Sequence, residues 1–126
     1  MKERNAEEKR ALYWLCCCPC LGAVSIRKLG SYFGSYQELI NIEETALEKA
    51  QILTSAQKKG FLQWKKEFSR CSSAYDRMGD KRIRFVTPLD LEYPQRLLEI
   101  SDYPMGLFLY GALPSDDKPS VAVVGA

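Results

Sequence analysis

The sequence of 126 residues contains no histidine. This absence removes the usual general base, the Ser-His-Asp and Cys-His catalytic arrangements, and zinc sites that depend on imidazole ligands. An enzymatic role would therefore need carboxylates, lysines or an external cofactor.

The sequence also lacks a long apolar run, since no stretch approaches the roughly 18 consecutive apolar residues of a membrane span. Its first eight residues, MKERNAEE, are too polar and acidic for a signal peptide. From these two absences we expect a cytoplasmic protein with no membrane partner.

The net charge of +2 is unevenly distributed along the chain. Residues 1–82 carry 15 Lys/Arg and 10 Asp/Glu, whereas residues 83–126 carry 3 Lys/Arg and 6 Asp/Glu. A mildly basic first part is compatible with nucleic-acid binding. It is equally compatible with the ordinary solvated surface of a helical domain.

Capping and periodicity signals predict that residues 1–79 form a helical domain. Asn5 and Glu8 can form an N-cap pair before a helix that Pro19 ends. Three further helices are expected, at Val24–Phe33, Ser35–Ile40 and Thr45–Ala50. Gly34 is placed to end the first of these three.

Thr54 and Gln57 form a capping box that opens the longest expected helix, which runs to about Met78. Apolar residues recur along it in steps of three and four, at Phe61, Trp64, Phe68, Cys71, Tyr75 and Met78. A basic stripe accompanies them, at Lys59, Lys66, Arg70 and Arg77, widened by Lys58 and Lys65. This stripe either tracks a phosphate backbone or is the exposed side of an amphipathic helix.

After Gly79 the pattern changes to short strands. Ile83–Val86 and Leu107–Tyr110 are predicted strands, with a helical turn started around Pro94 between them. Val121–Val124 is a continuous apolar run followed by glycine, which is typical of a strand buried on both faces of a parallel sheet. We therefore expect residues 80–126 to be the start of an incomplete Rossmann-like α/β domain.

Four of the five cysteines cluster at the end of the first helix, at Cys16, Cys17, Cys18 and Cys20. Cys17 and Cys20 form a C-x-x-C pair, but a structural zinc site needs four ligands and only Cys71 lies elsewhere. The pattern favours small buried residues that close a helical hairpin. A metal or redox site is the alternative.

Residues 21–29 lie between two predicted helices and resemble one helix-hairpin-helix, in which backbone amides approach a DNA phosphate. Gly22 occupies the second of the two glycine positions of such a hairpin, and Cys20 occupies the first. The predicted nucleic-acid contacts are Gly22, Ser25 and Lys28 of this hairpin, together with Lys59, Lys66 and Arg70 of the basic stripe. A purely structural hairpin is the alternative.

Three motifs follow one another between residues 90 and 126. Asp90–Ile100 resembles D-x-x-Y-P-x-x-L-x-x-I, Pro104 to Gly111 resembles P-x-x-L-x-x-x-G, and Val121–Ala126 resembles hydrophobic-A-hydrophobic-V-G-[SA]. Their order and spacing resemble the DprA family (also called Smf), bacterial DNA-processing proteins of natural transformation. The helical part, with its Leu-Gly hairpin and the sequence GSYQEL, is similar to the SAM-like or helix-hairpin-helix-like domain that precedes the Rossmann-like domain in this family.

The resemblance implies a recombination mediator that is not an enzyme and that needs no cofactor or metal. Such proteins bind and protect single-stranded DNA and help to load the RecA recombinase. In the family, the DNA groove, most of the RecA-contacting surface and the main dimer surface lie in the Rossmann-like domain. The resemblance thus implies a homodimer whose RecA contact lies beyond residue 126, and it assigns Gly125 to the DNA-contacting loop. A SAM-like protein-interaction domain and part of a nucleotide-binding Rossmann enzyme are the alternatives.

Overall fold

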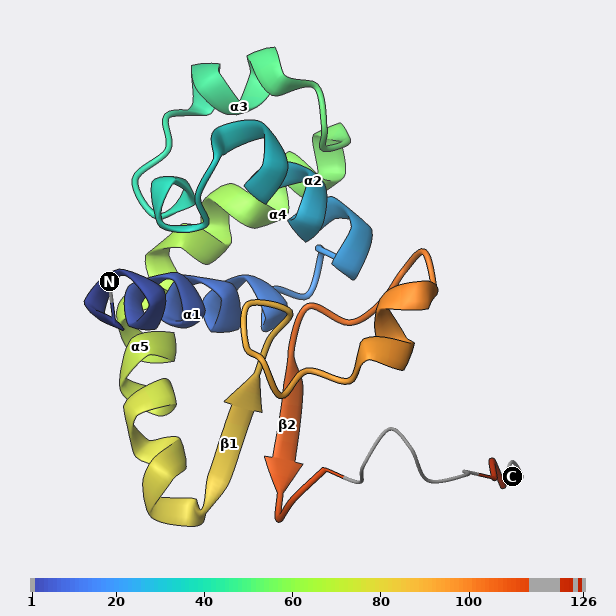
Figure 1. The fold of residues 1–126 in the computed structure, drawn as a ribbon. Helices are drawn as coiled ribbons and strands as arrows, with labels where there is room; N and C mark the ends of the chain where they lie inside the picture. Colours follow the sequence, from blue (N-terminus) through green and yellow to red (C-terminus); the bar gives the residue numbers. More distant parts are fainter. Residues whose placement is uncertain (1, 114–120, 124, 126) are drawn as a thin grey trace.

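The computed structural model describes residues 2–113, 121–123 and 125, with side chains described from Asn5 onward. The chain is mainly helical, as expected, and carries a small antiparallel sheet (Figure 1). The helices are α1 (Lys2–Cys16), α2 (Ala23–Phe33), α3 (Glu44–Ala50), α4 (Ser55–Trp64) and α5 (Phe68–Arg77). The strands are β1 (Ile83–Val86) and β2 (Leu107–Tyr110). Short 3₁₀ turns are η1 (Gln37–Leu39), η2 (Lys65–Glu67), η3 (Met78–Lys81) and η4 (Gln95–Glu99).

Helix α1 lies at the centre of this arrangement. Helices α2, α3 and α4 lie on one side of it, and α5 with the β1–β2 pair lies on the other (Figure 1). Among the described residues, no helix has the length and apolarity needed to cross a membrane.

The central position of α1 explains why it is buried on more than one side. Ala11, Leu12, Trp14 and Leu15 have no exposed surface. The Trp14 ring contacts Phe61 of α4 and Phe68 of α5, with centroid distances of 5.6 and 5.5 Å. Leu12, Trp14, Leu15 and Phe61 belong to the hydrophobic core, and the half-buried Phe68 packs against it.

Trp14 and Trp64 are joined by two reciprocal hydrogen bonds. The Trp14 indole Nε1–H donates to the Trp64 carbonyl at 3.2 Å, and the Trp64 Nε1–H donates to the Trp14 carbonyl at 2.8 Å. Because a buried indole N–H without a partner is costly, this exchange satisfies both rings while fixing α1 against the end of α4.

The predicted single helix from Thr54 to Met78 is wrong in one respect, because it is interrupted. The capping box of Thr54 and Gln57 is confirmed, with the two side chains and backbone N–H groups bonded at 3.0 and 3.1 Å. Helix α4 then ends at Trp64, and the 3₁₀ turn η2 separates it from α5. A three-residue turn leaves the apolar spacing of three and four unchanged, so the periodicity of the sequence does not reveal the break.

The predicted N-cap pair of Asn5 and Glu8 is also wrong, because α1 already begins at Lys2. The Glu8 carboxylate instead accepts hydrogen bonds from the Ser35 hydroxyl and from the backbone N–H groups of Tyr36 and Gln37. A carboxylate placed at the start of a helical turn stabilises the free N–H groups there. Glu8 therefore caps η1 and ties the α2–α3 connection to α1.

The other predicted helices are present, with differences at their ends: α1 ends at Cys16, before Pro19, and the predicted helix Ser35–Ile40 is reduced to the 3₁₀ turn η1 (Gln37–Leu39). Gly34 ends α2 in the left-handed conformation, with φ of 79° and its N–H bonded to the Gly30 carbonyl. The two short helices that follow are present as η1 and α3.

Strands β1 and β2 are confirmed and pair in antiparallel register, with Phe85 opposite Phe108. The aromatic rings of this pair lie against Tyr13 of α1, at centroid distances of 5.5 Å for Phe85 and 6.0 Å for Phe108. Tyr75 of α5 contacts both Tyr13 and Phe85. This aromatic cluster attaches the sheet to the helical part of the chain.

The third predicted strand, Val121–Val124, is not formed in the described residues. Residues 121–123 have no strand conformation, and the side chains of Val121 and Val123 are 89% and 95% exposed. Val124 lies outside the described residues. An apolar run becomes a strand only when a neighbouring strand satisfies its backbone groups, and β1 and β2 pair only with each other in the described part of the chain. The parallel sheet expected of a Rossmann-like domain is therefore not seen there.

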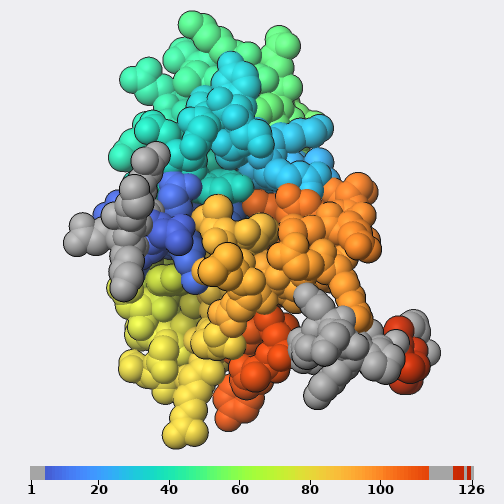
Figure 2. Space-filling view, viewed as in Figure 1, coloured from blue at the N-terminus to red at the C-terminus, as the bar shows by residue number. Residues whose placement is uncertain are grey.

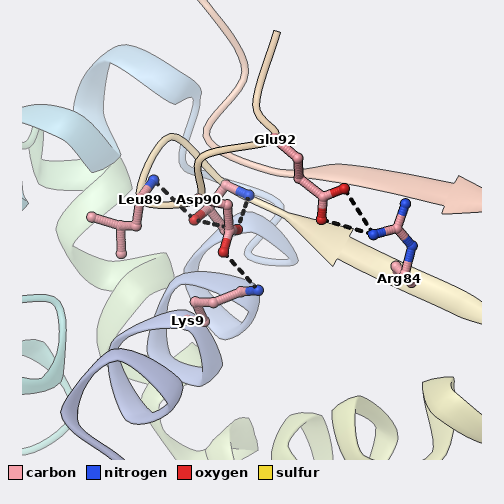
Figure 3. A network of polar contacts seen from close by, with 6 residues as sticks. Lys9, Arg84, Leu89, Asp90 and Glu92 are labelled. Atoms are coloured by element: carbon pink, nitrogen blue, oxygen red, sulfur yellow. Dashed lines mark hydrogen bonds and ion pairs between the residues drawn. The ribbon is translucent and has the colours of Figure 1, made fainter. Parts of the chain in front are cut away.

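A polar network fixes the turn that follows β1 (Figure 3). One oxygen of the Asp90 carboxylate accepts hydrogen bonds from the N–H and the hydroxyl of Thr87, at 2.8 and 3.2 Å. Its other oxygen pairs with the Lys9 ammonium of α1 at 3.1 Å. Thr87 is fully buried, so Asp90 supplies the partner that its backbone N–H needs. Beside this network, Arg84 and Glu92 form an ion pair at 2.8 Å.

We predict that replacing Trp14 with Phe lowers the free energy of unfolding by about 2 kcal/mol, because it leaves a gap and an unpaired Trp64 carbonyl. Urea denaturation followed by circular dichroism measures this change. Tyr32→Phe is the control, because the Tyr32 side chain is exposed and its change is expected to stay within about 0.5 kcal/mol. Equal stability of both variants would contradict the central role of the tryptophan pair.

We predict that Asp90→Ala costs about 2 kcal/mol of stability, because the buried Thr87 N–H is left without its acceptor. Glu92→Ala is the matched control, since it removes a carboxylate from an exposed ion pair nearby and should cost less than about 1 kcal/mol. The same denaturation measurement compares the two variants. A cost for Glu92→Ala as large as that for Asp90→Ala would refute the buried-acceptor explanation.

Candidate nucleic-acid interface

The predicted hairpin residues come together at the start of α2. Gly22 is the N-cap residue of α2 and has no side-chain cap, so the first N–H groups of the helix have no side-chain acceptor. Lys28 is exposed six residues further along the chain, within α2. Ser25 is half-buried, and its hydroxyl accepts a hydrogen bond from the Gln57 amide at 3.4 Å. Ser25 therefore helps to hold the hairpin against α4, in addition to any contact with phosphate.

The basic stripe is divided by the helix break. Lys59 lies on α4, Lys66 on η2 and Arg70 on α5, and all three are exposed. Within the described part of the chain, Lys59 and Lys66 take part in no hydrogen bond or ion pair. Arg70 bonds Glu67 at 2.7 Å and lies over the Trp64 ring at 6.0 Å. Arg77 of α5 is exposed and likewise unpaired in the described chain, so Lys59, Lys66 and Arg77 are the stripe cations whose charge is fully available to a phosphate.

Two cations that widen the stripe in the sequence have structural partners. The Lys58 ammonium pairs with the Glu48 carboxylate at 2.8 Å, which joins α4 to α3. The Lys65 ammonium donates to the Ile42 carbonyl. These contacts anchor the α3 region to α4.

Gly125 is exposed, and no atom of the described chain outside its own neighbours lies within 4 Å of where a Cβ would stand. The structure therefore does not bring Gly125 together with the hairpin at Gly22 or with the basic stripe. Its assignment to a DNA-contacting loop remains a prediction.

A further group of cations lies around the 3₁₀ turn η3 and the start of β1. Arg77, Lys81, Arg82 and Arg84 all carry exposed side chains. Helical periodicity singled out only Arg77, because the other three lie after the end of α5, where that pattern no longer applies. The signal that could have found them is local charge, since residues 77–84 contain four basic residues and one acidic residue.

The cysteine cluster is packed into the helical hairpin. All five cysteines are free, and Cys18 and Cys71 are buried. The structure brings together Cys18 and Cys20, with their Sγ atoms 3.3 Å apart, and not the C-x-x-C pair of Cys17 and Cys20. No group of three or more potential metal ligands occurs among the described residues.

Burial also controls the chemistry of these thiols. It raises the pKa of the Cys16 and Cys18 thiols to about 12 and also raises the pKa of Cys17. A thiol that stays protonated at neutral pH is a poor nucleophile and a poor metal ligand. The geometry supports the interpretation of this cluster as small packing residues.

A cavity of about 390 Å³ lies between α1, α5 and β1 and is a candidate binding site. Its charged lining residues are engaged with one another or with neighbours, because Lys9 pairs with Asp90, Arg84 with Glu92, and Asp76 with Arg10. With its charges balanced in this way, the cavity offers no net attraction for an anion.

The motif residues of the 90–111 segment have structural roles. Tyr93 is 2% exposed, and its hydroxyl donates to the Pro104 carbonyl at 2.6 Å. Burial raises the pKa of the Tyr93 phenol, which keeps the donor protonated. Pro94 precedes η4, and Gly111 follows β2 with φ of 101°, a conformation that favours glycine. Together these residues close the connection between β1 and β2.

Comparison with known proteins finds a family match that contains this segment. Residues 84–126 match the family model described as DNA recombination-mediator protein A. Searches of the curated proteins and of the solved structures gave no significant match. The matched region begins within β1 and contains Asp90, Tyr93 and Gly111. Residues 84–126 are therefore similar to the DNA recombination-mediator protein A (DprA) family.

Proposed function

We propose that this protein is a non-enzymatic recombination mediator that binds single-stranded DNA and helps to load RecA onto it. The observation that carries the proposal is the match of residues 84–126 to the DNA recombination-mediator protein A family. The exposed cations Lys59 and Lys66 add physical support, because neither is neutralised within the described chain. The homodimer implied by the family resemblance is part of the same proposal.

The charge distribution fits a ligand recognised mainly through its phosphates. Lysines that face solvent attract a phosphate backbone and release its counterions, which gives affinity without reading the base sequence. The aromatic residues of the α4–α5 stripe contribute to the core, as Phe61 and Trp64 show by their contacts with Trp14. Binding on this face is therefore expected to be electrostatic and strongly dependent on salt.

We predict salt-sensitive binding of a fluorescent oligothymidylate of about 20 nucleotides, measured by fluorescence anisotropy between about 50 and 200 mM salt. The double variant Lys59→Ala, Lys66→Ala should bind more weakly at low salt. For this variant, the slope of log K against log salt concentration should be less steep by about 0.7 for each phosphate that it no longer neutralises.

Lys49→Ala is the matched control for this experiment. Lys49 is an exposed lysine on α3 that is not part of the stripe, and its removal changes the net charge by one unit, as each of the two stripe substitutions does. A wild-type chain that shows no salt-sensitive binding at micromolar concentration would rule out DNA binding by residues 1–126.

A second measurement tests the RecA part of the proposal. A protein that loads RecA should shorten the lag before RecA filaments form on single-stranded DNA covered by a single-strand-binding protein. We expect a protein that carries this chain to shorten the lag in a DNA-dependent ATPase assay of RecA, in proportion to its own DNA affinity. An unchanged lag at a concentration that saturates the DNA would contradict RecA loading.

A second candidate function is protein interaction. It is favoured by exposed aliphatic side chains on the β1–β2 connection, a segment coloured orange in Figure 2: Leu89, Leu91, Leu98 and Ile100. Leu91 is completely exposed, and the other three side chains are between 39% and 48% exposed. This candidate is compatible with the first, because a mediator must contact both DNA and a recombinase.

A further inference from the structure

A cavity of about 480 Å³ lies at the open end of the β1–β2 pair. It is lined by Gly79, Arg82, Ile83, Arg84, Tyr110 and Gly111. Its walls therefore combine one aromatic ring, two guanidinium groups and two glycines. Figure 2 shows the yellow residues before β1 and the orange-red end of β2 next to each other at the lower end of the molecule.

Tyr110 is the aromatic component of this cavity. It lies opposite Ile83 in the sheet register, and its side chain is 82% exposed. Tyr13, Tyr75, Phe85 and Phe108 all take part in ring contacts, whereas Tyr110 has none among the described residues. An aromatic ring with a free face can stack on a nucleobase, because every base presents a π-face of its own.

Arg82 is the unpaired cationic component of the cavity. It follows η3 and adopts the left-handed conformation, with φ of 58°. Glycine or asparagine adopts this conformation at lower cost than arginine, so the backbone conformation gives no reason for an arginine at this position. The Arg82 side chain has no ion pair or hydrogen bond within the described chain, and the same holds for its neighbour Lys81.

Arg84 is the second cationic residue of the cavity lining, and its side chain is held by two partners. One of its nitrogens contacts both oxygens of Glu92 at 2.8 Å, and the other donates to the Gly111 carbonyl at 3.4 Å. These contacts fix the guanidinium across the ends of both strands. Glu92 partly neutralises Arg84, so the charge available to a ligand comes mainly from Arg82 and Lys81.

We propose that this cavity binds one nucleotide of single-stranded DNA, with the base stacked on Tyr110 and the adjoining phosphate held by Arg82 and Lys81. The inference rests on the proposed single-stranded DNA binding and adds a second contact region, separate from Lys59 and Lys66. Gly79 and Gly111 leave the entrance open, because no heavy atom lies within 4 Å of where their Cβ atoms would stand. A positively charged groove beside a free aromatic face is the combination that binds single strands without sequence preference.

The test compares Tyr110→Leu, Tyr110→Phe and Arg82→Ala with the wild-type chain in the anisotropy assay. Tyr110→Leu keeps an apolar side chain but removes the ring, and we expect it to weaken binding about tenfold. Tyr110→Phe keeps the ring and should stay within about twofold of wild type. Arg82→Ala should weaken binding and reduce its salt dependence, whereas Lys49→Ala should reduce affinity less.

The outcomes separate this inference from the function on which it rests. Wild-type binding that is equally strong in Tyr110→Leu and Arg82→Ala would overturn the nucleotide site and leave single-stranded DNA binding standing. Absence of wild-type binding would overturn both. Circular dichroism of each variant checks that the fold is retained.

Photo-crosslinking to an oligonucleotide that contains 5-iodouracil gives an independent readout in the wild-type chain, where folding of a variant is not at issue. Crosslinks at Tyr110 would support the site. Crosslinks found only on α2 or α4 would overturn it.

Discussion

The reciprocal hydrogen bonds between Trp14 and Trp64 determine how the rest of the chain is placed. Each indole N–H donates to the backbone carbonyl of the other residue, so neither ring can move without leaving a buried donor and a buried acceptor unpaired. This constraint fixes α1 against the end of α4, at the point where the chain turns through η2 into α5. The contact therefore positions α1 relative to the end of α4 and the start of α5.

The sheet is attached to this centre by two further sets of contacts from α1. Tyr13 packs against Phe85 and Phe108, and Lys9 pairs with Asp90 in the turn after β1. Asp90 in turn supplies the acceptor for the buried Thr87 N–H. The segment that matches the family model, residues 84–126, thus includes Phe85, Phe108 and Asp90, which hold the sheet and the turn after β1 against α1. The residues proposed to contact DNA lie on surfaces that this arrangement leaves exposed.

Those surfaces differ in the kind of contact that they offer. Lys59 and Lys66 present charge alone, on the α4–η2 side. The open end of the β1–β2 pair combines charge from Lys81 and Arg82 with the free ring of Tyr110. Phosphate contacts give affinity for any nucleic acid, while stacking requires unpaired bases. A protein that uses both therefore favours single strands over duplex.

The sequence by itself determined the helix caps at Thr54 and Gly34, both described strands and the family signature, because each depends on residues close together in the chain. It placed the hairpin residues and the stripe cations but could not tell Lys65, bonded to the Ile42 carbonyl, from Lys66. Only the tertiary structure decided the break after Trp64, the use of Glu8 as a cap for η1, the missing strand at Val121–Val123 and the grouping of Arg82 with Tyr110. Each of these depends on partners distant in sequence, and local propensity and periodicity carry no information about such partners.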